Sequence, residues 1–444
     1  MSNDYLNNIS YLFVPFSPEN LSDYSEFRKN ITPSNGWEPM QPENRYLHRY
    51  VFERFVGQRQ GVMDSYHFHI DPDFARTHGL SLGSLYSTAA KKYKDQQKVY
   101  FQFKISDVQL FAFNTTVCIL AFELHFEDDD PLKIATAQYY LRKIATERVH
   151  LVEDGTDAKQ ESFVDIASCL LADAAKTIPL DFFFYAARNN EKANFLTYVD
   201  VPKKENYDEE LFFLKWCYHD GFDFSAAAYD SCSETFQQNE NTYWGISVSA
   251  AVCLVYRDEK SKAFVEKRFQ TNFRKQYLMT YILLLHQKYV MYLFLTKMSV
   301  GISGKLAELE QYKERLYNFE TNYMFSYISE VPQYQNFYQA VRKTFALDQL
   351  FKEVQEPLNQ LTEIQRQEAE KEQKAYDEKI NTALTALSLL TIISTIADAL
   401  GLMENLDWLV ATNVARVIQI VLGVFVLLGG TYTVCRLISL RNKR

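Results

Sequence analysis

Two long apolar stretches near the C-terminus constrain this chain more than any other feature. They cover residues 381–403 and 417–438, and each gives roughly 33 Å of helix at about 1.5 Å per residue. The hydrocarbon core of a bilayer is about 30 Å thick, so each stretch is long enough to cross it. The sequence therefore predicts two C-terminal transmembrane helices joined by a short external loop at 404–416.

The charges beside these stretches predict their orientation. The loop at 404–416 carries Glu404 and Asp407, whereas the tail at 439–444 is basic. Positive residues remain on the cytoplasmic side of a membrane, so with two spans both termini are expected in the cytoplasm, at the cell inner membrane. The N-terminus lacks the basic and apolar pattern of a secretory signal.

Composition narrows the class of the remaining chain. Aromatic residues make up 15% of the sequence, while only 14 Gly and 11 Pro are present, which favours long regular elements. The net charge of −9 argues against a nucleic-acid-binding surface over the whole molecule. The 6 cysteines form no CxxC pair and are expected to be reduced cytosolic thiols.

Periodicity predicts an α+β cytosolic domain over residues 1–260. Helical spacing of apolar residues occurs at 131–147 and 162–176. The early strands are expected to form an antiparallel meander. The predicted strands are YLFVPF, RYVFERFV, VYFQFKI, VQLFAFN, VCILAFELHF, DFFFYAAR, ANFLTYVDV and YWGISVSAAVCLVY.

Beyond residue 260 the pattern becomes helical. A helical cytosolic region is predicted at 261–331, with helices at 262–299 and 303–328, followed by a stalk helix at 332–380 that continues into the first span. Pro357 should kink or divide the stalk, because an interior proline removes a helical hydrogen bond.

The helix at 262–299 is apolar enough to suggest a third span. His286, Gln287 and Lys288 lie at its middle, and a central lysine costs about 2.5–3.5 kcal/mol on insertion scales. We therefore expect a core helix of the cytosolic part.

Polar residues interrupt the first span at regular intervals. The spacing of four, three, seven and three residues predicts a polar stripe along one side of the helix, about 60° to 80° wide at about 100° per residue. A carboxylate inside a span usually faces a bundle interior or an aqueous path. The alternative is that the hydroxyls bond to their own helix and that the carboxylate lies near the outer surface. The predicted pore-lining residues are Asn381, Thr385, Ser388, Thr395 and Asp398. One such helix cannot enclose a pore, so several copies are required.

The first span resembles the CorA family of divalent-cation transporters. Leu384-Thr385 and the run from Leu390 to Ile396, LTIISTI, resemble that family's first span, and the basic tail and the order of the domains are also similar. The stalk from 333 to 354 and YILLLHQKY are similar in style. The resemblance implies a homopentamer whose long helix lines the pore, with Mg²⁺ as a transported or regulatory ion and no other cofactor.

The chain departs from the family at the outer end of this span. The family has Gly-Met-Asn there, whereas this chain has Gly401, Leu402, Met403, Glu404 and Asn405, which are predicted to form the pore entrance. The ion preference of the family therefore does not carry over. Asp398 is the predicted metal-binding residue, as a ring of carboxylates that favours cations.

The cytosolic part is also longer than in typical CorA proteins. In this it resembles CorA-like membrane effectors of antiviral defence that occur beside type III CRISPR systems. That resemblance implies a small nucleotide messenger acting on the cytosolic domain, with no residues assigned to it.

Three other polar clusters have plainer alternatives. One cluster consists of Asp64, His67, His69 and Asp71, which could bind a metal or could be surface polar residues of a strand. The acidic run 127–130 could bind a regulatory cation or form a solvated turn. The charged stretch 366–379 fits a solvated stalk face with ion pairs at four-residue spacing.

The sequence contains no P-loop, GxGxxG, GxSxG or HExxH motif, so a non-enzyme is expected. The favoured function is a CorA-like homo-oligomeric cation channel gated by its cytosolic domain. The alternatives are a messenger-gated effector of antiviral defence and a membrane-tethered enzyme or scaffold.

Overall fold

The computed structural model describes most of the chain up to helix α12. The described ranges are 7–41, 43, 46–56, 58–59, 62–63, 65–91, 98–152, 160–185, 192–225, 232–258, 261–299 and 306–404, with isolated positions between 417 and 432. The chain divides into two units, Met1–Leu361 and Thr362–Arg444. The residues 405–416, most of the predicted second span and the tail lie outside the described part.

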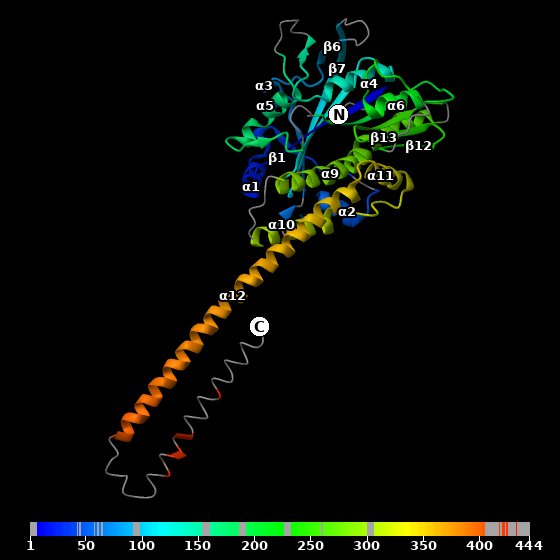
Figure 1. The fold of residues 1–444 in the computed structure, drawn as a ribbon. Coiled ribbons are helices and arrows are strands. Elements are labelled where there is room, and N and C mark those ends of the chain that lie inside the picture. The colour runs from blue at the N-terminus through cyan, green and yellow to red at the C-terminus, as the bar shows by residue number, and fades with distance from the viewer. Residues whose placement is uncertain are drawn as a thin grey trace. The chain divides into compact units, whose positions relative to one another are not determined.

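The first unit is α+β, as predicted, and its centre is a mixed sheet (Figure 1). Among the described residues, 12 strands join this sheet, with a main path β12-β13-β14-β11-β1-β8-β7-β5-β2. The strands β3 and β4 form a separate pair. The strands are β1 (Asn8–Pro18), β2 (Trp37–Pro39), β3 (Gln58–Arg59), β4 (Val62–Met63), β5 (Ser65–Ile70), β6 (Leu85–Lys91), β7 (Lys98–Phe113), β8 (Cys118–Phe126), β9 (Val149–Leu151), β10 (Leu180–Asp181), β11 (Asn194–Asp200), β12 (Ser233–Asn239), β13 (Thr242–Ser247) and β14 (Ala250–Val255).

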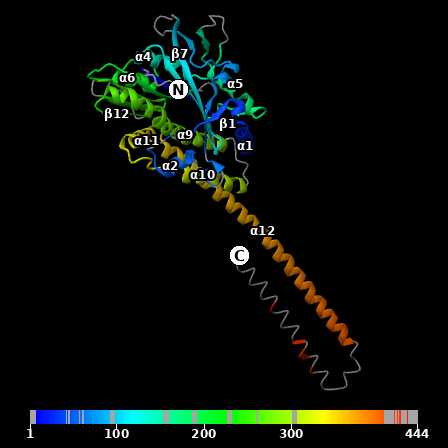
Figure 2. The same cartoon turned by 180° about the vertical axis from the view of Figure 1, so that it is seen from behind.

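Helices cover both faces of the sheet. The helices α1, α4, α5 and α6 contribute to one core, whereas α9, α10, α11 and the start of α12 contribute to the other. The views from two sides show α9 and α11 side by side (Figure 2). The helices are α1 (Leu21–Asn30), α2 (Arg49–Val56), α3 (Pro72–Thr77), α4 (Pro131–Leu141), α5 (Phe163–Ala175), α6 (Asp208–Trp216), α7 (Lys262–Phe264), α8 (Gln270–Asn272), α9 (Leu278–Ser299), α10 (Leu306–Tyr323), α11 (Pro332–Thr344) and α12 (Leu347–Glu404).

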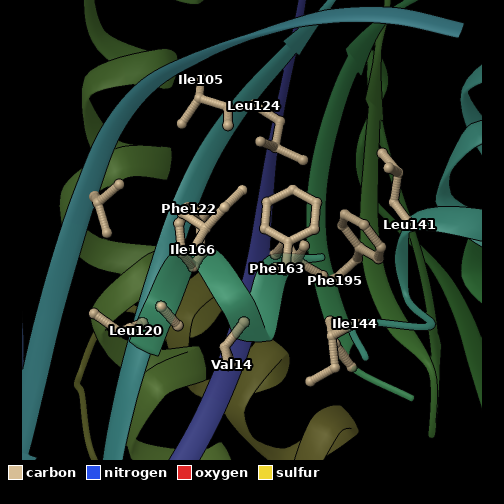
Figure 3. Packing of buried hydrophobic residues seen from close by; sticks show 14 of the residues in the cluster. Val14, Ile105, Leu120, Phe122, Leu124, Leu141, Ile144, Phe163, Ile166 and Phe195 are labelled. Atoms are coloured by element: carbon tan, nitrogen blue, oxygen red, sulfur yellow. The ribbon is translucent and has the colours of Figure 1, made fainter. Parts of the chain in front are cut away.

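Strand β1 shows why the sheet needs helices on both sides. Its successive side chains point to opposite faces, so Leu12 and Val14 enter one core while Tyr11 and Phe13 enter the other. All of its residues are buried, as is typical of a strand covered on both faces. Phe163 of α5 packs over the first of these faces (Figure 3).

The structure corrects several predicted strands. RYVFERFV is helix α2, because its apolar residues at 51, 52, 55 and 56 follow a helical rather than an alternating spacing. Of the described part of DFFFYAAR, residues 181–185, only Asp181 lies in a strand, at the end of the two-residue β10. The early strands β1, β5, β7 and β8 pair antiparallel, as predicted. They do not form a simple meander, because β1 lies between β8 and the later strand β11.

Two other predictions placed the ends of strands wrongly. VYFQFKI and VQLFAFN form the single strand β7, whose register shifts between Ile105 and Asp107 through a bulge instead of a turn. YWGISVSAAVCLVY divides into β13 and β14. The Ser247 hydroxyl accepts a hydrogen bond from the Ser249 amide at 2.9 Å, which stabilises the turn between them.

The helix at 262–299 lies in the core, as predicted. It begins with α7 and α8 and two π-helical segments, η3 (Val265–Phe269) and η4 (Phe273–Tyr277), before α9. Its apolar window is 89% buried. Both π segments place extra residues in the first turns of an otherwise regular helix.

The predicted stalk at 332–380 is two helices, and the division is not at Pro357. Helix α11 ends at Thr344 and α12 begins at Leu347, because Ala346 adopts a φ of 50°, in the left-handed region. Pro357 lies inside the continuous helix α12. The break was missed because no glycine or proline marks it.

Candidate functional site

Helix α12, 58 residues long, is buried at its start and exposed over most of its length. Its first turns belong to the core, where Leu347, Phe351, Val354 and Leu358 are buried at helical spacing. From 362 to 398 no described side chain is buried. The apolar part of this helix thus has no buried side chain among the described residues, whereas most of the similarly apolar segment that contains α9 is buried.

The charged part of α12, residues 366–379, separates the packed turns from the apolar segment. Its side chains are exposed, and Arg366 pairs with Glu370 at 3.6 Å, one helical turn away. This agrees with the predicted solvated stalk face.

The hydroxyls of the predicted stripe bond to their own helix. Thr385 donates to the carbonyl of Asn381 at 2.7 Å, Ser388 to Leu384 at 2.8 Å and Thr395 to Thr391 at 2.7 Å. This is the geometry of the plainer alternative. Each hydroxyl oxygen nevertheless keeps acceptor capacity after it donates its proton. A face made of such oxygens suits a cation better than an anion.

The width of the stripe differs from the prediction. At about 100° per residue, Asn381, Thr385, Ser388 and Thr395 lie within about 80° of one another. Asp398 lies about 60° further around the helix. The predicted stripe is therefore a narrow hydroxyl and amide face, with the carboxylate at its flank.

Thr391 was omitted from the predicted stripe, although its position falls between Thr395 and Asp398. It also donates to its own helix, to the Leu387 carbonyl at 2.8 Å. The signal was in the sequence, since 391 and 395 are one turn apart. Thr391 extends the polar surface from the narrow face to Asp398.

The predicted pore entrance is described only in part. Helix α12 continues through Gly401, Leu402 and Met403 to Glu404, and Gly401 is exposed. Asn405 lies outside the described residues. The described part of the predicted pore entrance is therefore helical.

Comparison of the chain with protein-family models, with curated proteins and with solved structures finds no match. Two of the described helical segments, Lys262–Met298 and Leu347–Asp398, are long and apolar enough to cross a membrane. Since the first is largely buried, the second is the candidate that remains in the described part of the chain.

The predicted cluster around β5 is assigned to structural roles. His67 is buried and contacts Gln109 at 3.0 Å, while His69 pairs with Glu38 at 3.2 Å. Burial lowers the pKa of His67 to about 4, so its imidazole is neutral. Asp71 accepts from the Phe74 amide as the N-cap of α3. Asp64 lies outside the described residues, and no group of three possible ligands occurs among the described ones.

The acidic run 127–130 likewise organises the local backbone. Asp128 pairs with Lys133 at 2.6 Å, and Asp130 is the N-cap of α4. Asp129 accepts from the side chains of Asn7 and Asn8. These contacts match the predicted solvated turn.

A buried ionic network was missed by the sequence reasoning. Glu123 accepts from Tyr11 at 2.6 Å and pairs with Arg274 at 3.1 Å and His125 at 3.0 Å. Burial by itself would raise the pKa of Glu123, but the hydrogen bond from His125 and the charge of Arg274 lower it to about 2. Arg274 comes from η4, 151 residues further along the chain, and so no local motif could have revealed the pair.

Proposed function

We propose that this chain is a homo-oligomeric membrane channel for cations, with helix α12 lining the pore. The observation that carries the proposal is the exposure of the apolar segment of α12. Leu384, Leu387, Leu390 and Ile393 are exposed by 55, 59, 63 and 61%. Apolar surface left in water costs about 25 cal/mol per Å², so lipid or other protein must cover this segment.

The narrow polar face supports a pore in preference to a simple anchor. An anchor has no need of an amide and three hydroxyls on one side. The hydroxyls donate to their own helix, but lipid would still face the Asn381 amide and the free acceptor capacity of the hydroxyl oxygens at a cost. Several copies of α12 that turn this face inward would surround a path lined by oxygen acceptors. The number of copies implied by the CorA resemblance is five, and the second span at 417–438 would then face lipid.

The same arrangement places the first unit in the cytoplasm at the inner membrane. The basic tail at 439–444 supports this orientation. Since α12 begins in the core of the first unit and continues to Glu404, a change in that core can reach the pore through one helix. This is the basis for gating by the cytosolic domain.

The test is cation flux in liposomes. We expect Asp398→Asn, which keeps the size of the side chain and removes its charge, to lower cation flux or cation preference much more than Asp407→Asn in the loop. Carboxylate rings favour cations by charge. Unchanged flux and selectivity in the Asp398→Asn protein, at an unchanged oligomeric state, would show that this carboxylate does not act on a conducting path.

A further inference from the structure

A cavity in the first unit is lined in part by charged and amide side chains, which neither the proposed pore nor the hydrophobic core explains. It has a volume of about 200 Å³ and lies between α9, α10 and the turn that joins β7 to β8. Helix α10 turns one face towards it, since Tyr312, Arg315, Asn318 and Asn322 recur at spacings of three and four. The sequence reasoning assigned nothing to this region.

Two cations line the cavity from different helices. Lys297, in the last turn of α9, donates to the backbone carbonyl of Glu19 at 3.2 Å, and Arg315 of α10 lies over the ring of Tyr312. Among the described residues, no carboxylate forms an ion pair with either. The Glu19 carboxylate is near enough to Lys297 to act on its charge without pairing.

These two cations are also partly withdrawn from water. Burial lowers the pKa of Lys297, and the charge of Arg315 lowers it further. Burial lowers the pKa of Arg315 as well. Two like charges that line one partly desolvated hollow disfavour each other, even with Glu19 near Lys297, and an anion bound between them would relieve this.

The rest of the lining combines aromatic and amide side chains with aliphatic ones and the Thr115 hydroxyl. Phe294 and Tyr312 meet edge to face with ring centroids 6.4 Å apart, and Phe319 adds a further ring. Asn318 and Asn322 offer both donors and acceptors. Aromatic walls with a few placed polar groups are typical of small-molecule sites.

We propose that this cavity binds a phosphate monoester that carries a planar ring. The phosphate lies between Lys297 and Arg315, the ring lies against Phe294 and Tyr312, and the amides of α10 contact its polar edge. The volume sets the size of the ligand, because typical pockets for drug-sized ligands are about 300–1,000 Å³. A phosphate with one ring system fits a hollow of this volume.

The experiment uses full-length protein in detergent and a buffer free of phosphate and sulfate. Calorimetric titration compares phenyl phosphate with glycerol 3-phosphate, which lacks the ring, and with phenol, which lacks the charge. Phenyl phosphate is expected to bind more tightly than either. Equal binding of glycerol 3-phosphate would overturn the role of the ring and point to a lipid headgroup, and no binding of phenyl phosphate would overturn the site.

Variants test the two cations separately from folding. Lys297→Met and Arg315→Met are expected to weaken phenyl phosphate by about tenfold or more, as for the loss of a charged hydrogen bond, while Lys297→Arg and Arg315→Lys retain more of the affinity. The matched control is Lys313→Gln, since Lys313 is exposed on the same helix and does not line the cavity. Wild-type affinity in both methionine variants would overturn the proposal. Because the measurement is binding, failure of the channel proposal leaves this result unaffected.

Discussion

Lys288 lies in the middle of helix α9 with its ammonium group inside the protein. It donates to the Asn194 side chain at 3.1 Å and lies 4.5 Å from the centre of the Phe345 ring. Burial lowers the pKa of Lys288 to about 7, and the charge of Arg142 adds to the effect. The residue that excludes α9 from a membrane is therefore accommodated by an amide and an aromatic face.

The pKa of Lys288 predicts a pH dependence of stability. Between about pH 7 and pH 10 the unfolded chain holds a proton on this lysine and the folded chain does not, so stability should rise with pH by on the order of 1 kcal/mol per pH unit. Lys288→Met should lose this contribution. Thermal unfolding of both proteins from pH 7 to pH 10 measures the difference, and parallel profiles would contradict the assignment.

Neighbouring cations in η4 give a second residue-scale prediction. Arg274 pairs with the buried Glu123, whereas Lys275 pairs with Glu43 at the surface at 2.7 Å. Arg274→Met should lower the free energy of unfolding by about 3–5 kcal/mol, because it leaves a buried carboxylate without its cation.

Lys275→Met is the matched control and should change stability by less than about 1 kcal/mol. Denaturant unfolding at pH 7 compares the two variants with the wild type. Similar effects of both would mean that the Glu123 network is not the buried anchor of η4.

At the scale of the elements, a local sequence pattern was sufficient for some helices and strands and absent for others. Strands with long alternating or fully apolar runs, such as β1 and β8, and the capped helix α5 agree with the sequence prediction. The break at Ala346 could not be predicted, because an alanine with positive φ has no sequence signal. The cavity also could not, since its lining joins segments far apart in the chain.

Helices α11 and α12 each contain one proline, and the two positions should differ in their effect on stability. Pro332 occupies the first turn of α11, where its missing amide costs nothing, whereas Pro357 lies inside α12. Pro357→Ala should raise the free energy of unfolding by about 1–3 kcal/mol by restoring a helical hydrogen bond.

Pro332→Ala should be close to neutral by the same reasoning. Thermal unfolding of both variants, followed by the far-ultraviolet circular dichroism of their helices, distinguishes them. A loss of stability in Pro357→Ala would show that α12 needs a local bend there.

At the scale of the whole molecule, the first unit carries its own cores on both faces of the sheet. A chain that ends at Leu361 should therefore be soluble without detergent and monomeric. The full chain should require detergent and should form an oligomer, since its exposed apolar segment lies beyond that point.

Light scattering of both proteins measures their masses. A full-length particle with the mass of a monomer or dimer would contradict the pore, because too few α12 helices would be present to surround it. An insoluble 1–361 chain would show that the two units do not fold independently.

The length of α12 has a mechanical consequence. Beyond Leu358, the last residue of α12 that is buried among those whose side chains are described, 40 residues lead to Asp398, a rod of about 60 Å at 1.5 Å per residue. Each degree of tilt at the base of such a lever displaces its tip by about 1 Å, when the rod is straight. A rotation of a few degrees at the base of this rod, just after Leu358, would thus be amplified into a displacement comparable with the diameter of a hydrated ion.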